Sequence, residues 1–211
     1  MTGTPGAILL DIEGTTSSIA FVTETLFPYA RRNLAAYVAS HIEQVRPILA
    51  QVPGDDPLAT LLRWMDEDRK ETPLKTLQGL IWAEGYASGE LHGHVYPDTP
   101  EAIRRWRDRG IGVHVYSSGS VGAQKLIFGN SVAGDLTPLL GRYFDTSIGP
   151  KREPGSYGRI AAALDLPPEE ILFVSDVQAE IDAARSAGMA ALLIDREGSA
   201  GEVRSLAEVV P

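Results

Sequence analysis

Short apolar runs recur along the chain, and none of them shows the periodicity of a helix. They span residues 7–10, 112–116, 171–174 and 189–194, and a short extended piece is expected at 144–148. Runs of this length and composition predict strands that are buried on both faces. Helical patterns separate them along the chain. Alternation of strand and helix is typical of a doubly wound parallel sheet, so we expect an α/β fold.

The longest interval between two predicted strands has a helical pattern throughout. Residues 21–52 carry apolar side chains at helical spacing, with a helix start expected near Pro28 and a break or kink at Pro47. A second helix is predicted over residues 58–69. A third is expected from an N-cap at Thr72 to about residue 87.

Three helices exceed what a crossover between parallel strands needs, which is only about 12 residues. We therefore expect residues 18–96 to form a helical cap, inserted into an α/β core made of residues 1–17 and 97–211. A lid at this place could cover the carboxyl ends of the strands and exclude water from them. The alternative is that these helices pack on the sheet as ordinary crossover helices.

Beyond the predicted cap, helices continue to alternate with the strands. One begins near Pro100 and is expected to be capped by Thr99 or Asp98. Others are predicted over residues 121–128 and 156–164. These helices supply the layers that a parallel sheet needs on its two faces.

The composition excludes several classes of function. The 211 residues include no cysteine, which rules out disulfides, thiolate zinc sites and a cysteine nucleophile. A net charge of -9 argues against a nucleic-acid surface, because such a surface needs a basic patch. No apolar run approaches the ~20 residues of a membrane span, and residues 1–6 lack the charged start of a signal peptide. We expect a cytoplasmic monomer with no nucleic-acid or membrane partner.

Polar residues follow directly after the predicted strands. Asp11 and Glu13 come after the first strand, Ser117 and Ser118 after the second, and Ser175-Asp176 after a later one. The first of these stretches alone also fits an ordinary Asx-type turn. If the strands share one parallel sheet, however, their carboxyl ends face one crevice.

Such a crevice would combine carboxylates, hydroxyls and the ammonium of Lys151, which stands in a loop-like Gly-Pro-Lys segment. Carboxylates in pairs bind Mg²⁺. Hydroxyls, backbone amides and a lysine hold a phosphoryl group. An aspartate can also act as a nucleophile through an aspartyl-phosphate. The pattern therefore indicates phosphoryl chemistry.

This constellation resembles the haloacid dehalogenase superfamily of phosphotransferases. Asp11-Ile12-Glu13-Gly14-Thr15 is similar to the first motif of that superfamily, Ser118 to the second, Lys151 to the third and Ser175-Asp176 to the fourth. Most phosphatases of the superfamily carry Asp at the second acid of the first motif, where this chain has Glu13. The string Leu-Leu-Asp-Ile-Glu-Gly-Thr-Thr resembles the enolase-phosphatases of methionine salvage.

The resemblance extends well beyond these motifs. It runs from Leu9 to about Asp182, cap included, whereas the tail beyond Gly188 adds little. Further matching strings are Leu-Phe-Pro-Tyr at 26–29, Asp-Arg-Lys at 68–70, Leu-Gln-Gly at 77–79 and Ala-Gln-Lys-Leu at 123–126. The chain departs from the family at Pro154-Gly155. The resemblance implies a serine-containing segment at this place.

The resemblance implies a role for each site residue. Asp11 would be the nucleophile, and Glu13 the general acid and then the base for water. Asp11, Asp176 and the backbone carbonyl of Glu13 would bind one Mg²⁺. Lys151 would neutralise the phosphoryl oxygens. The residues expected to hold the phosphate are Ser117, Ser118, Gly119 and Lys151.

The activity implied by the resemblance is bifunctional. Such an enzyme enolises 2,3-diketo-5-methylthiopentyl-1-phosphate, a small phosphorylated metabolite, and then removes the phosphate to leave an acireductone. Two alternatives remain open. One is a generic Mg²⁺-dependent phosphatase or a dehalogenase of the same superfamily. The other is a non-catalytic protein that binds a phosphorylated ligand, against which the intact pair Asp11 and Glu13 argues.

Several other polar residues are weaker candidates. Glu180 and Asp182 are expected either just outside the site or on the surface of a helix. His92 and His94 place two imidazoles close together, but we expect a loop there rather than a metal site, because no further ligands stand nearby.

Overall fold

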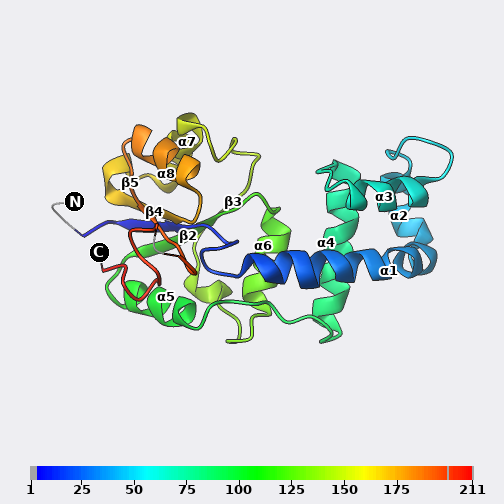
Figure 1. The fold of residues 1–211 in the computed structure, drawn as a ribbon, viewed down its shortest axis with the longest axis horizontal. Helices are drawn as coiled ribbons and strands as arrows, with labels where there is room; N and C mark the ends of the chain where they lie inside the picture. Colours follow the sequence, from blue (N-terminus) through cyan, green and yellow to red (C-terminus); the bar gives the residue numbers. More distant parts are fainter. Residues whose placement is uncertain (1–3, 199, 211) are drawn as a thin grey trace. The chain divides into compact units, whose positions relative to one another are not determined.

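The computed structural model describes residues 4–198 and 200–210, and the chain divides into two compact units (Figure 1). The α/β unit runs up to Ile19 and resumes at Gly93, and the helical unit comprises Ala20–His92. The helical unit is thus inserted between the first and second strands of the α/β unit. No helix in the described ranges is both long and apolar enough to cross a membrane.

A five-stranded parallel sheet forms the centre of the α/β unit, which confirms the predicted fold class. Its order is β3-β2-β1-β4-β5. In the register, Leu10 lies opposite Val115 on one side and Val174 on the other. The residues that follow these three strands therefore emerge side by side at one edge. The strands are β1 Ala7–Leu10, β2 Gly112–Tyr116, β3 Tyr143–Phe144, β4 Ile171–Ser175 and β5 Ala190–Leu193.

Helices cover both faces of this sheet, as Figure 1 shows, with α7 and α8 on one face and α5 on the other. Leu9 and Phe173 pack with Tyr157, Ile160 and other buried residues in the core beneath α7 and α8. All four residues of β1 are fully buried, which explains why this strand has no polar face. The helices are α5 Asp98–Asp108, α6 Val121–Gly129, α7 Pro154–Leu164 and α8 Gln178–Ser186, with short 3₁₀ turns at Thr137–Leu139 and Pro168–Glu170.

The helical unit has its own apolar core. Leu34, Leu61 and Leu77, from three different helices, are fully buried in it. Trp82 Nε1 donates a hydrogen bond to Leu26 O at 2.8 Å. Its elements are a short π-helix η1 Phe21–Leu26 and the α-helices α1 Phe27–Ser40, α2 Ile42–Leu49, α3 Pro57–Asp66 and α4 Thr72–Ala87.

Three expected boundaries in the helical unit were wrong. The first helical segment breaks at His41, and Pro47 lies inside α2, where it removes only one backbone hydrogen bond. Helix α3 ends at Asp66, because Asp68 adopts a left-handed φ of 50°. The N-cap of α4 is Glu71 rather than Thr72, which is already helical.

Two further expectations failed in the α/β unit. No side chain caps α5: its N-cap is Pro97, while Asp98 and Thr99 bond to distant groups instead. Residues 145–148 form a turn, because Ser147 N and Ile148 N bond back to Asp145 and close it. The unexpected Pro154-Gly155 pair forms the first turn of α7, where proline needs no hydrogen-bond acceptor.

Candidate active site

Asp11 is the first residue after β1, and it is almost completely buried. Its backbone N–H donates to Val174 O at 3.0 Å, so the parallel ladder still holds it. One carboxylate oxygen, Oδ1, accepts the Ile12 N–H at 2.7 Å. The side chain is therefore held in one orientation at the carboxyl edge of the sheet.

The chain then turns sharply through residues 12–17. Ile12 O accepts the N–H groups of Thr15, Thr16 and Ser17 at 2.9–3.1 Å. Gly14 has a φ of 71° and packs against Asp176, whose Oδ2 lies 2.1 Å from where a Cβ would stand. Only glycine fits this position. The turn therefore brings the Asp176 carboxylate against the backbone that follows Asp11.

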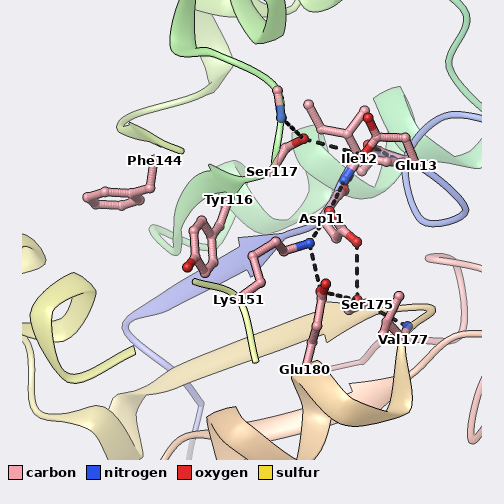
Figure 2. Close-up of polar contacts among 12 residues, drawn as sticks. Asp11, Ile12, Glu13, Tyr116, Ser117, Phe144, Lys151, Ser175, Val177 and Glu180 are labelled. Atoms are coloured by element: carbon pink, nitrogen blue, oxygen red, sulfur yellow. Dashed lines mark hydrogen bonds and ion pairs between the residues drawn. The ribbon is translucent and has the colours of Figure 1, made fainter. Parts of the chain in front are cut away.

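Lys151 lies at the centre of a buried charge cluster (Figure 2). Its Nζ is 2.6 Å from Asp11 Oδ1 and 2.6 Å from Glu180 Oε2. The ring of Tyr116 lies beside the ammonium, with its centroid 5.7 Å from Nζ. Tyr157 Oη donates to Lys151 O at 2.7 Å and fixes the backbone there. The ammonium is thus held between two carboxylates and beside an aromatic ring.

Ser175, at the end of β4, joins the two carboxylates that Lys151 contacts. Its Oγ is 3.1 Å from Asp11 Oδ2 and 2.9 Å from Glu180 Oε2, and it accepts the Val177 N–H at 3.2 Å. A hydroxyl has one proton, so it donates to one carboxylate at a time. The carboxylate that receives the Ser175 proton therefore affects the other one: when Ser175 donates to Glu180, Asp11 loses this hydrogen bond.

Glu13 lies on the other side of Asp11 from this cluster. Ser117 Oγ donates to Glu13 Oε2 at 3.3 Å and accepts the Gly119 N–H at 3.1 Å. Figure 2 shows Ser117 and Glu13 together at the end of β2, apart from Glu180. Ser118 is exposed, one residue further along. The hydroxyl and amide expected to hold a phosphoryl group are thus present beside the second acid.

Carboxylates outnumber cations in this site, and their pKa values respond to it. Burial raises the pKa of Glu13, and the charge of Asp11 raises it further. Burial and then the same charge raise the pKa of Asp176 to about 6 and also raise the pKa of Glu180. Burial alone would lower the pKa of Lys151, but Asp11 and Glu180 outweigh it and raise that pKa, so the ammonium stays charged.

The donor set fits a hard divalent cation. No three His, Cys, Asp or Glu side chains within the described ranges converge as a ready-made metal cage. Mg²⁺ does not require one, because it binds through one or two carboxylates and keeps waters or phosphate oxygens as further ligands. Asp11 and Asp176 offer carboxylates, and the charge of Asp11 is, after burial, the next cause of the raised pKa of Asp176. A divalent cation bound there would neutralise this negative charge.

The other polar residues named from the sequence lie in different settings. Glu180 is buried and contacts Lys151, so the alternative that it lies on the surface was wrong. Its position on the first turn of α8, shortly after Ser175-Asp176, was the sequence signal that could have indicated this. Asp182 is exposed and bonds to Gln178. His94 Nδ1 accepts the Ser18 N–H at 3.1 Å, as expected for a loop residue.

Comparisons with known proteins show which family the chain resembles. A model of the haloacid dehalogenase-like hydrolases matches residues 5–188. The chain belongs to this family of hydrolases. An enolase-phosphatase E1 of Pseudomonas aeruginosa (strain UCBPP-PA14) is 53% identical over 219 residues, covering 97% of each chain. An enolase-phosphatase E1 of Methylococcus capsulatus is 54% identical over 205 residues, covering 92% of this chain and 90% of the relative.

Solved structures share the fold of the chain. The UTR4 protein of Saccharomyces cerevisiae is 38% identical, with a TM-score of 0.83 and coverage of 93% of this chain and 92% of that one. A dehalogenase that is 18% identical, with a TM-score of 0.60 and coverage of 99% and 97%, shares the fold. The predicted resemblance to the enolase-phosphatases is confirmed, and the protein is a phosphatase enzyme of that bifunctional type.

Proposed function

We propose that this enolase-phosphatase enolises a phosphorylated 2,3-diketone with a methylthio tail and then releases phosphate through a phospho-aspartate on Asp11. The product would be an acireductone, and Mg²⁺ would be the cofactor. The observation that carries this proposal is the unequal setting of two acids separated by one residue, Asp11 and Glu13. Asp11 is ion-paired with Lys151, whereas burial and the charge of Asp11 raise the pKa of Glu13. Two carboxyl groups in such different settings are suited to different roles.

In the phosphatase step, a carboxylate oxygen of Asp11 forms a bond to phosphorus as the bond from phosphorus to the ester oxygen breaks. Glu13, whose raised pKa favours the protonated form, gives its proton to the leaving oxygen. Glu13 is then a carboxylate and takes a proton from water. The water oxygen bonds to phosphorus, the bond to Asp11 breaks, and phosphate leaves with Asp11 restored.

Positive charge and hydrogen-bond donors stabilise the phosphoryl oxygens during this transfer. Lys151 supplies an ammonium 2.6 Å from Asp11, and Ser117, Ser118 and the Gly119 N–H supply donors on the opposite side. Asp11, Asp176 and the carbonyl of Glu13 would hold Mg²⁺. When bound, Mg²⁺ would polarise the ketone oxygen for enolisation and the phosphoryl oxygen for transfer.

The helical unit is the proposed cap that selects the substrate. It leaves the α/β unit eight residues after Asp11, at Ile19, and returns at Gly93. Phe27 and Trp82 stack within it, with ring centroids 6.1 Å apart, and Trp82 is only partly buried. Aromatic and aliphatic side chains of this kind suit an apolar thioether tail. We further propose that the protein acts as a cytoplasmic monomer.

A turnover panel tests the proposal. The diketone phosphate and a set of simple phosphate esters are each supplied with Mg²⁺, and phosphate release and the ultraviolet absorbance of the enediol are followed together. We expect strong preference for the diketone phosphate, with absorbance rising before or with phosphate. Equal turnover of every ester would favour a generic phosphatase. Binding without turnover would favour a protein that only holds phosphorylated ligands.

A further inference from the structure

Arg196 lies outside every motif of the site, yet it contacts the turn that follows Asp11. Its side chain is only 9% exposed. Its Nε donates to Thr15 O at 3.1 Å, and its Nη2 donates to the same oxygen. Its Nη1 donates to Asp98 Oδ2 at 2.7 Å, and its guanidinium lies 4.1 Å from the centre of the Tyr96 ring. One side chain thus joins three segments that are far apart in sequence.

The carbonyl that Arg196 holds belongs to the turn that carries Glu13. On its inner side, this turn is tied to the nucleophile, because Thr16 Oγ1 donates to Asp11 O at 3.0 Å. On its outer side, Thr16 O accepts the Tyr96 N–H at 2.9 Å and the Thr99 hydroxyl at 3.1 Å. Arg196 supplies the matching restraint on the neighbouring carbonyl, Thr15 O.

Asp98 anchors the other end of the guanidinium. Its Oδ2 accepts the Leu206 N–H at 2.6 Å as well as the bond from Arg196. Its second oxygen, Oδ1, is buried and has no hydrogen-bond partner among the described residues. A partly buried carboxylate with one oxygen unpaired is stabilised by its ion pair with Arg196. The position of the Arg196 guanidinium is therefore fixed by charge as well as by hydrogen bonds.

We propose that Arg196 is a positioning residue for the reaction, which holds the turn that places Glu13 relative to Asp11. The inference rests on the proposed roles of these two acids. The planar fork of arginine donates to Thr15 O and Asp98 at once, which the point charge of a lysine does not reproduce. Small displacements of a catalytic group are costly in rate, on the order of 10²-fold for about 1 Å.

The test compares Arg196→Lys and Arg196→Ala with the wild type. Arg196→Lys keeps a positive charge beside Asp98, so the melting temperature of this variant should stay near that of the wild type. We expect kcat for phosphate release to fall about 10-fold in Arg196→Lys and on the order of 10²-fold in Arg196→Ala, with KM changed less than about 2-fold. Added guanidinium ion should raise kcat of Arg196→Ala, and urea should not.

Two further variants make the result decisive. Arg185→Lys is the matched control, because Arg185 pairs instead with Glu202 and Ala191 O, and its kcat should not change. Arg196→Lys with wild-type kcat would overturn the inference. Asp11→Asn is measured in parallel: if it still releases phosphate, the proposed function fails, whichever way Arg196→Lys behaves. An inactive Asp11→Asn beside a fully active Arg196→Lys would reject the role of Arg196 alone.

Discussion

The two units of the molecule use their charged residues in different ways. In the helical unit, the pairs Arg31–Asp66 and Lys70–Asp68 lie at the surface, with side chains 46–74% exposed. In the α/β unit, the side chain of Lys151 is only 6% exposed and contacts two carboxylates. Exposed pairs contribute little to stability, typically below about 1 kcal/mol. A buried charge cluster is costly to desolvate, which points to chemistry rather than stability as its reason.

The largest expected effect comes from removing the nucleophile while keeping its shape. Asp11→Asn should lower phosphate release by about 10⁴-fold or more, because the covalent route is lost. Enolisation should suffer less at saturating Mg²⁺, since it needs only a polarised carbonyl and a base. The measurement follows ultraviolet absorbance and free phosphate together, and a phosphorylated enol should accumulate in the variant. Equal loss of both steps would mean that Asp11 is needed for both.

Removing the buried ammonium should destabilise the fold far more than removing an exposed one. Lys151→Met leaves Asp11 and Glu180 without their cation, and we expect a loss of about 3–5 kcal/mol in the free energy of unfolding. Lys70→Met is the matched control on the helical unit, with an expected loss below about 1 kcal/mol. Urea unfolding at neutral pH in EDTA measures both. Equal losses of unfolding free energy in Lys151→Met and Lys70→Met would contradict the difference between the buried and the exposed charge.

The helical unit should control selectivity rather than chemistry. Joining Ile19 to Gly93 with a short glycine-serine linker removes Ala20–His92 and leaves all the proposed catalytic residues in place. We expect preference for the methylthio substrate over a simple phosphate ester to fall at least about 10-fold, because apolar contacts to the tail are lost. Competition between the two substrates measures the ratio. An unchanged preference in a folded variant would remove the helical unit from substrate selection.

The raised pKa of Asp176, caused by burial and by the charge of Asp11, predicts how stability depends on pH without metal. The pKa of Asp176 is raised to about 6, so the folded state binds this proton more tightly than the unfolded state, where the pKa is about 3.9. The resulting stabilisation is present at low pH and is lost as pH rises through about 6. After allowance for partial exposure, metal-free protein should lose up to about 1 kcal/mol between pH 5 and pH 7.5.

Chemical denaturation in EDTA at these two pH values measures this difference. Asp176→Asn is the control, and it should show a smaller change with pH. Added Mg²⁺ should stabilise the wild type more at pH 7.5 than at pH 5, because a carboxylate must lose its proton before it binds metal. Stability of the metal-free protein that rises across this range would contradict the account of Asp176.

Much of the sheet and its edge could be predicted from the sequence, for a clear physical reason. Strands buried on both faces give continuous apolar runs, as in β1, and the residue after each run must emerge at the carboxyl edge. Asp11, Ser117 and Asp176 were predicted at this edge in this way. Lys151 comes after a strand of only two residues, and its loop-like Gly-Pro-Lys segment and its resemblance to a known motif indicated it.

The rest depended on contacts between segments far apart in sequence. Asp98 has a residue type that favours helix capping, but Arg196 and Leu206 take up its carboxylate instead. The position of Glu180 depends on how α8 packs against the sheet, which its own sequence does not specify. Arg196 lies in the tail beyond the recognised motifs. A local pattern cannot indicate a partner that lies 98 residues away.

Direct detection of a phosphoryl group on Asp11 tests the central claim. Glu13→Gln should slow hydrolysis of the phospho-aspartate, because it removes the base that takes a proton from water. It also removes the acid for the leaving oxygen and so slows formation, and the reaction is therefore sampled over a long time course. The variant is mixed with the diketone phosphate and Mg²⁺, quenched in acid, digested and analysed by mass spectrometry. We expect a phosphoryl group on the peptide that contains Asp11, and none when Asp11→Asn is added. A phosphoryl group on another residue, or turnover with no covalent phosphoryl group at any time, would contradict the account.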